Sequence, residues 1–251
     1  MRQFNICGFM RSGQHAVHCW IISGFSPGSV EYLLKPWWDN KLATHSLNSD
    51  GNDLPDNLKP IVRNVIPKNR ELVLMATEEI PLLYTDVLSG HKIFVIRSFP
   101  NLIASRYQYT IRNKNQLNGN VSTNLLEEYM AYLQLAATST DKNTTFILYD
   151  KFVMSKYYRK HIAKRLSLNY EKMNMDGVAS NGAGSSFIGL EKEMDTYQYV
   201  TRYKTLPKHL ISLALDNTCK KLCCEVFGKE LCQPMYAWLE SRNKIQNTKT
   251  N

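Results

Sequence analysis

The sequence predicts an α/β fold with a central parallel sheet and helices on both faces. Short apolar segments alternate along the chain with longer segments of helical periodicity, which is typical of strand–helix–strand units. One short segment, Lys92–Ile96 (KIFVI), is apolar after its first residue, as expected of a strand covered on both faces. At the start of the chain, polar and apolar residues alternate over Gln3–Phe9, which predicts the first strand.

The segments after this first strand keep the alternation. Gln14–Ser23 repeats apolar residues at helical spacing, and Asn48–Pro60 is a polar segment typical of a surface loop. Glu71–Thr77 has the composition of a second strand, and Ile80–Leu88 has that of a helix. The strand at 92–96 comes next, and Pro100–Arg112 then begins with the proline that suits a first helical turn.

The second half of the chain is mainly helical. Asn124–Thr138 predicts an amphipathic helix, Thr145–Tyr149 a further buried strand and Met154–Arg165 another helix. Asp176–Gly189 is rich in Gly and Ser and is expected to be irregular. Two more helices, Leu206–Phe227 and Pro234–Arg242, precede an expected flexible tail at 243–251. No linker-like change of composition divides the chain, so we expect one domain over residues 1–251.

The composition favours an anionic ligand. The 31 Lys and Arg residues outnumber the 22 Asp and Glu residues, which gives a formal net charge of +9. Such a charge suits a nucleotide, a nucleic acid, an acidic lipid or a sulfated or phosphorylated metabolite, and it fits a solvated basic surface equally well.

The sequence also bears on location and metals. No apolar run approaches the ~20 residues of a membrane span, and the N-terminal segment lacks the pattern of a signal peptide, so we expect a cytoplasmic protein with no membrane partner.

The six cysteines are expected to be reduced. Four of them match only half of a zinc pattern and are interpreted as helix packing, so no metal site is predicted. These four are Cys219, Cys223, Cys224 and Cys232.

The strongest functional signal is the loop after the first strand. Gly8 and Gly13, with four residues between them, lie between a strand and a helix, which is the skeleton of a phosphate-binding loop. Glycine lets the backbone approach an anion, and a helix N-terminus offers N–H groups and partial positive charge. A plain strand–turn–helix with a glycine bend is the alternative interpretation.

The residues around Gly13 differ from those of a nucleoside triphosphatase. Such a loop continues with Lys and then Ser or Thr, which contact the phosphates and Mg²⁺. This chain has Gln14 and His15 there, and its cation lies inside the loop at Arg11. The pattern favours an anion site that needs neither a triphosphate nor a metal ion. For His15, a solvent-facing position in the first helical turn is the alternative.

A second basic position follows the strand at 92–96. Arg97 leaves this strand, Pro100 opens the next helix, and Ser105 lies eight residues after the arginine. A guanidinium fork and a hydroxyl are both suitable donors to a phosphate. Taken alone, Arg97 is equally compatible with a structural ion pair.

Together these segments resemble the sulfotransferase family, whose donor is 3′-phosphoadenosine 5′-phosphosulfate (PAPS). The run from Arg11 to His15 looks like the family's Lys/Arg-Ser-Gly-Thr-Thr motif, which holds the 5′-phosphosulfate, although Gln14 and His15 replace its hydroxyl residues. Arg97 and Ser105 match the family's second motif, which holds the 3′-phosphate. The resemblance implies a sulfotransferase-like fold and donor contacts from Arg11, Ser12, Gly13, Gln14, His15, Ala16, Arg97 and Ser105.

Weaker matches extend the resemblance over roughly Arg2 to Lys204. Ser186 and Phe187 are similar to a Ser-Phe element that lies near the adenine in family members. Tyr149 is similar to a strand-end tyrosine that also lies near the nucleotide. Arg202 falls where some relatives carry a basic cluster for the 3′-phosphate.

Sulfuryl transfer also needs a base, and the family uses histidine or glutamate. Glu79 stands where the cytosolic branch has its catalytic histidine, and Glu31 is placed like the catalytic glutamate of the Golgi branches. We favour Glu79, because strand ends of open parallel sheets point into the binding crevice. Arg11 is expected to stabilise charge on the leaving group. Alternative bases are Glu78, His15, His18 and His45. An aromatic acceptor pocket is expected from Trp37, Trp38, Tyr84, Tyr107 and Tyr109.

The resemblance predicts a PAPS-dependent sulfotransferase of the bacterial or small-molecule type. It would move the sulfuryl group to a hydroxyl or amine of a small-molecule acceptor and release 3′,5′-adenosine bisphosphate (PAP), with no metal and no nucleic-acid partner. The sequence leaves a homodimer open. The alternatives are a P-loop kinase of a small metabolite, which should carry Lys-Ser/Thr after Gly13, and a basic nucleic-acid-binding protein, for which no motif is present.

Overall fold

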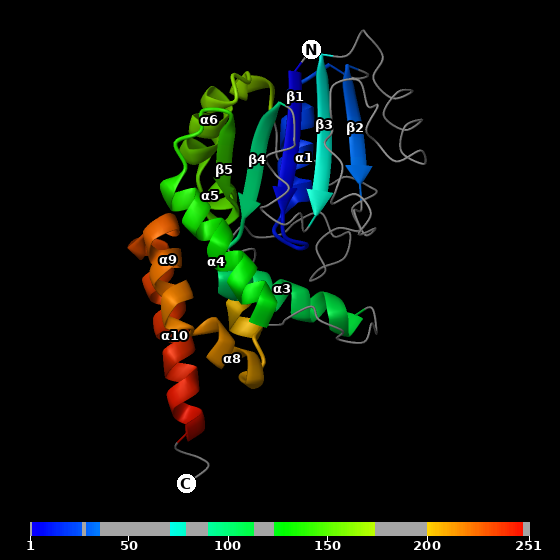
Figure 1. Cartoon of the computed structure of the whole chain (residues 1–251). Coiled ribbons are helices and arrows are strands. Elements are labelled where there is room, and N and C mark those ends of the chain that lie inside the picture. The colour runs from blue at the N-terminus through cyan, green and yellow to red at the C-terminus, as the bar shows by residue number, and fades with distance from the viewer. Residues whose placement is uncertain are drawn as a thin grey trace. The chain divides into compact units, whose positions relative to one another are not determined.

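The computed structural model describes residues 2–26, 29–35, 71–78, 90–112, 123–173 and 200–247. It contains a five-stranded sheet with strand order β2-β3-β1-β4-β5, seen in Figure 1. The pairings of β1 with β3, β1 with β4 and β2 with β3 are parallel. The predicted α/β class with a central parallel sheet flanked by helices is therefore confirmed. The strands are β1 (Arg2–Gly8), β2 (Val30–Lys35), β3 (Leu72–Glu78), β4 (His91–Ile96) and β5 (Thr144–Leu148).

The strand register sets the edge of the sheet at which the loop after β1 begins. Gly8, the last residue of β1, is paired with Glu78 of β3 and with Val95 of β4. The carboxyl ends of these three strands therefore meet at one edge of the sheet, which is where open parallel sheets place their ligands. Every residue from Phe4 to Phe9 is buried, so both faces of β1 are covered.

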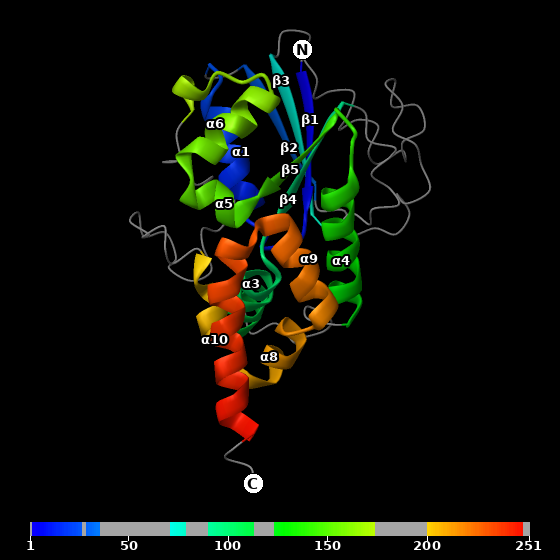
Figure 2. The ribbon, with the colours of Figure 1, turned by 90° about the vertical axis from the view of Figure 1, so that its left-hand side faces the viewer.

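The described residues form two compact units, each assembled from separate stretches of the chain. The first unit takes its residues from Met1–Val95, Thr140–Ile147 and Tyr157–Ala179. It holds most of the sheet and three helical elements. These are α1 (Gln14–Ser23), α6 (Lys156–Arg165) and the short 3₁₀ helix η3 (Tyr170–Lys172). Helices α1 and α6 lie on the same side of the sheet (Figure 2).

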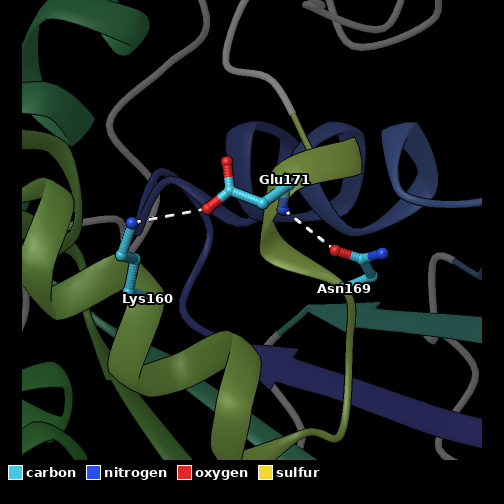
Figure 3. A network of polar contacts seen from close by, with 3 residues as sticks. All are labelled: Lys160, Asn169 and Glu171. Carbon is cyan, nitrogen blue, oxygen red and sulfur yellow. Dashed lines mark hydrogen bonds and ion pairs between the residues drawn. The ribbon is translucent and has the colours of Figure 1, made fainter.

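A small polar network joins α6 to η3. Asn169 caps η3 by accepting a hydrogen bond from the backbone N–H of Glu171 at 3.1 Å. The Glu171 carboxylate lies 3.4 Å from the Lys160 ammonium, as Figure 3 shows. Both charged side chains are well exposed to solvent, so this ion pair contributes little to stability.

The second unit takes its residues from Ile96–Ser139, Leu148–Lys156 and Ser180–Asn251, and its described part is mainly helical. Helix α4 packs on α9, α9 on α10, and α3 on both η5 and α8. Buried aromatic and aliphatic side chains such as Phe99, Tyr129, Leu133, Phe227 and Leu239 fill these contacts. The helical elements are α3 (Phe99–Arg112), α4 (Thr123–Thr138), α5 (Tyr149–Met154), η5 (Arg202–Thr205), α8 (Lys208–Ala214), α9 (Asn217–Phe227) and α10 (Lys229–Asn247).

Three predicted helices differ from those in the structure. The segment 206–227 divides into α8 and α9, because the Asp216 side chain accepts a hydrogen bond from the Cys219 N–H and starts a new helix. The segment 154–165 divides between α5 and α6 at Ser155. Helix α10 begins before Pro234 and continues to Asn247, so residues 243–247 are helical rather than part of a tail.

Some of the predicted segments lie outside the described residues. They are the loop at 48–60, the helix at 80–88 and the irregular segment at 176–189. The six cysteines, all within the described ranges, carry thiols rather than disulfides, and Cys219, Cys223 and Cys232 are buried in the packing of α9 and α10. No helix within the described ranges is long and apolar enough to cross a bilayer.

Candidate functional site

The loop between β1 and α1 has an unusual backbone. Arg11 has φ 72° and Gly13 has φ 99°, so two residues of this short loop are left-handed. A left-handed arginine is strained by its Cβ, whereas glycine carries no such cost. The Ser12 N–H donates to the carbonyl oxygen of Phe9 at 2.9 Å and closes the turn. Alternating backbone of this kind turns N–H groups toward a common point, which is how anion-binding loops are built.

Gly8 is required by packing rather than by its dihedral angles. A Cβ at this position would lie 2.6 Å from the carbonyl oxygen of Val95, 2.8 Å from Gln14 Nε2 and 2.9 Å from Ser12 Oγ. The Gln14 and Ser12 side chains therefore fold back over Gly8. Ser12 is fully buried, and within the described residues its hydroxyl has no hydrogen-bond partner.

Helix α1 begins with an N-terminus that suits an anion. Gly13 is the N-cap and supplies no side-chain cap, and the first turn contains no acidic residue. The N–H groups of Ala16 and Val17 are directed to the Gly13 carbonyl oxygen at 3.1 and 3.4 Å. The positive end of the helix dipole is therefore not neutralised by the chain's own side chains in this turn.

The two histidines of α1 are held neutral by their surroundings. Burial, and secondarily the Arg11 guanidinium, lower the pKa of His15 below its ordinary value. Burial and the nearby His15 lower the pKa of His18 to about 3. The two rings are in edge-to-face contact at 5.7 Å between their centres. His15 is thus a partly buried neutral imidazole close to Arg11, not the solvent-facing residue of the alternative interpretation.

Arg97 lies in the second unit, directly after β4, and is only 2% exposed. Its guanidinium carbon is 5.2 Å from the centre of the Tyr149 ring, a cation–π contact. The Tyr129 hydroxyl donates to the Arg97 carbonyl oxygen at 2.7 Å. The structure therefore brings the predicted residues Arg97 and Tyr149 together. Tyr149 is the first residue of α5, not the last residue of a strand, because the chain turns into a helix immediately after Leu148.

Ser105 and Arg202 also meet. Arg202 Nη1 donates to Ser105 Oγ at 2.8 Å, and both residues are buried. Ser105 comes from α3 and Arg202 from η5, so 97 positions of sequence separate them. We call this contact the Ser105–Arg202 pair. A guanidinium fixed beside a hydroxyl provides two kinds of donor suited to a phosphate oxygen.

A buried polar network that sequence reasoning missed connects these segments. Asp150 Oδ2 accepts from the Ser98 N–H at 2.7 Å, and Oδ1 accepts from Ser98 Oγ at 3.0 Å and Asn101 Nδ2 at 2.8 Å. Asp150, Ser98 and Asn101 are all fully buried. The sequence offered one local signal for these three residues, which is that they lie next to or between predicted site residues. Asp150 follows Tyr149, and Ser98 and Asn101 lie between Arg97 and Ser105.

Most of the remaining predicted site residues lie partly or wholly outside the described residues. Glu79, Ser186 and Phe187 lie outside the described residues. Glu31 is the second residue of β2, paired with Val73, and its side chain falls outside the described part. Within the described ranges, no cluster of three or more His, Cys, Asp or Glu residues is placed to hold a metal ion. Of the five residues predicted to form the aromatic acceptor pocket, Tyr107 and Tyr109 lie within the described ranges, and both are partly buried on α3. Trp37, Trp38 and Tyr84 are outside.

No protein-family model matches the chain. No curated protein matches its sequence either. Among solved structures, the chain is similar to the crystal structure of mouse sulfotransferase SULT7A1 complexed with PAP. The identity is 14%, the TM-score is 0.45, and 88% of each chain is covered.

Proposed function

We propose that this protein is a PAPS-dependent sulfotransferase of the small-molecule type. It transfers the sulfuryl group of PAPS to a hydroxyl or amine of a small-molecule acceptor and releases PAP. The observation that carries the proposal is the Ser105–Arg202 pair. The family resemblance assigned each residue separately to the 3′-phosphate, and the two side chains lie 2.8 Å apart.

Each unit, taken by itself, offers donors that suit one anionic group of such a nucleotide. The loop of the first unit offers Arg11, backbone N–H groups and a helix N-terminus that has no acid in its first turn. The second unit offers Arg97 beside an aromatic ring, together with the Ser105–Arg202 pair. We propose that the first set binds the 5′-phosphosulfate and the second set binds the 3′-phosphate.

The reaction moves one sulfuryl group and one proton. The acceptor oxygen or nitrogen attacks the sulfur, the bond between sulfur and the 5′-phosphate oxygen breaks, and the acceptor's proton passes to a base. Arg11 stabilises the charge that develops on the leaving phosphate, because its guanidinium stays cationic at all working pH values. His15 is neutral near pH 7 and can donate one hydrogen bond without adding charge. We assign the base to Glu79, with Glu31 as the alternative.

Nucleotide titration tests the proposal. Calorimetry without Mg²⁺ should detect PAP binding, and binding of AMP, which lacks the 3′-phosphate, should be weaker. A mass-spectrometric screen with PAPS and an acceptor library should then detect sulfate gain. Binding of ATP only with Mg²⁺ would favour a kinase. Salt-dependent binding of oligonucleotides without PAP binding would favour a nucleic-acid-binding protein.

A further inference from the structure

The buried network around Asp150 determines which way the Asn101 amide faces. Asn101 Nδ2 lies 2.8 Å from Asp150 Oδ1 and 2.9 Å from the carbonyl oxygen of Val200. Asn101 Oδ1 accepts from the Tyr203 N–H at 2.9 Å. A flipped amide would set its oxygen against two acceptors and its NH₂ against a donor. Only the observed orientation satisfies all of these groups.

Asn101 holds the backbone on both sides of Arg202, the residue that bonds to Ser105. Val200 and Tyr203 lie on either side of Arg202 in the chain, and both bond to the Asn101 amide through their backbones. Asn101 and Ser105 are four residues apart on α3, so they share one face of this helix. Asn101 thereby holds the η5 backbone at the place where Arg202 can meet Ser105.

Asp150 fixes the backbone next to Arg97. Its carboxylate binds both the N–H and the hydroxyl of Ser98, the residue after Arg97. The carbonyl oxygen of Ser98 accepts the Leu102 N–H at 2.9 Å and begins α3. A carboxylate at this point also suits the positive end of the α3 dipole.

We infer that Asn101 and Asp150 are positioning residues that hold the Ser105–Arg202 pair and Arg97 in the arrangement that binds the 3′-phosphate. This inference rests on the proposed function. Neither side chain needs to touch the ligand, because Asn101 acts through the backbone around Arg202 and Asp150 acts through Ser98. Buried polar networks in which every member is satisfied give this kind of fixed geometry.

The test compares two ligands across variants of the full chain. PAP and AMP differ by the 3′-phosphate, so the ratio of their dissociation constants reports on the 3′-phosphate site alone. Asn101→Asp replaces the donor facing Asp150 by an oxygen, and Asp150→Asn removes the carboxylate with little change of shape. We expect each to reduce the preference for PAP over AMP by about tenfold or more, with AMP affinity unchanged.

A matched control separates positioning from general destabilisation. Leu133→Ala empties a fully buried apolar site in α4 of the same unit and removes no polar group. It should lower stability while leaving the PAP preference at the wild-type value. The two side chains bond to each other at 2.8 Å, so the losses of preference in the double variant should be less than additive.

Three results would overturn the inference. They are an unchanged PAP preference in folded Asn101→Asp and Asp150→Asn, an equal loss in Leu133→Ala, or additive losses in the double variant. If Asn101→Asp does not fold, Asp150→Asn and the milder Asn101→Ser decide the question. A wild-type chain with no preference for PAP over AMP would instead refute the proposed function, so the two failures are distinguishable.

Discussion

The Arg202 guanidinium donates a hydrogen bond to the Ser105 hydroxyl at 2.8 Å across 97 positions of sequence. Serine in the middle of a helix is more often solvated or bonded to its own backbone. Here it is fully buried and receives a donor from another segment. Because hydroxyl oxygens both donate and accept, Ser105 can accept from Arg202 and still direct its own proton to an anion.

Ser105→Ala should weaken PAP binding while leaving AMP binding unchanged. The loss of one hydrogen bond to a charged group costs ~1.5–3 kcal/mol, which corresponds to roughly a tenfold to hundredfold change in affinity. Calorimetric titration measures both affinities. Thr110→Val is the matched control, because Thr110 is buried on the same helix and its hydroxyl donates to the Arg106 carbonyl oxygen of that helix. Equal PAP affinities in wild type and Ser105→Ala would remove Ser105 from the site.

Gly8→Ala should destabilise the first unit and distort the phosphate loop. The new Cβ would lie 2.6 Å from the Val95 carbonyl oxygen, which is held in the sheet beside Gly8 and cannot yield cheaply. Overpacking of this kind costs ~1–3 kcal/mol. Gly24→Ala is the control, since its Cβ would meet the flexible Met173 side chain at 3.0 Å. Urea unfolding should show a lower midpoint for Gly8→Ala than for Gly24→Ala, and the reverse order would contradict the packing argument.

His18 should make the protein less stable as the pH falls. The unfolded chain protonates this histidine below about pH 6.5, whereas burial keeps the folded form neutral down to about pH 3. The unfolded state therefore binds more protons in this window, so the contribution of His18 to stability is complete above about pH 6.5 and is lost progressively as the pH falls toward 3. The loss at pH 5 is on the order of 2 kcal/mol. In denaturant titrations at pH 5 and pH 7.5, His18→Gln should show a smaller pH dependence of the unfolding free energy than the wild type, and an equal dependence would contradict this role of His18.

Arg11→Gly should raise the stability of the protein and lower its activity. Glycine relieves the left-handed strain at this position, so the free energy of unfolding should rise by ~0.5–1 kcal/mol after the greater backbone entropy of glycine is subtracted. The same change removes the cation that we assign to the leaving phosphate, so turnover should fall. Arg11→Ala keeps the strain and loses the cation, and it should lose activity without the gain in stability. A fully active Arg11→Ala variant would exclude this role.

Glu79→Gln should spare PAP binding and depress turnover. A general base contributes ~10²–10⁴-fold to rate, and the amide cannot accept the acceptor's proton. Steady-state kinetics with an identified acceptor, together with PAP calorimetry, measures the two effects separately. Glu31→Gln provides the comparison. Full activity of Glu79→Gln with loss of activity in Glu31→Gln would transfer the role of base to Glu31.

Local patterns predicted much of the fold. The predicted boundaries of β1, α1, β4 and α3 lie within one residue of the observed ones. Strand β2 was not predicted, because its six residues mix charged and apolar types without clear alternation. The break at Asp216 was missed because the helical spacing continues across it, although an Asp before a helical run is an N-cap signal.

The site was predicted only in part. Arg97, Ser105, Tyr149 and Arg202 were predicted from the family resemblance, which depends on short stretches of chain. Asp150 and Asn101 could not be identified as partners, because their contacts join residues about 50 positions apart and depend on how α3 meets the end of β5. Buried polar partners of this kind are determined by tertiary packing and leave no periodic pattern in the sequence.

The interleaving of the two units has a consequence for biosynthesis. The last stretch of the first unit is Tyr157–Ala179, and it follows two stretches that belong to the second. A nascent chain that has emerged only as far as residue 156 therefore lacks α6 apart from its first residue, and it lacks η3 as well. Neither unit can be cut out as a contiguous fragment, so fragment expression and limited proteolysis should yield no independently stable half.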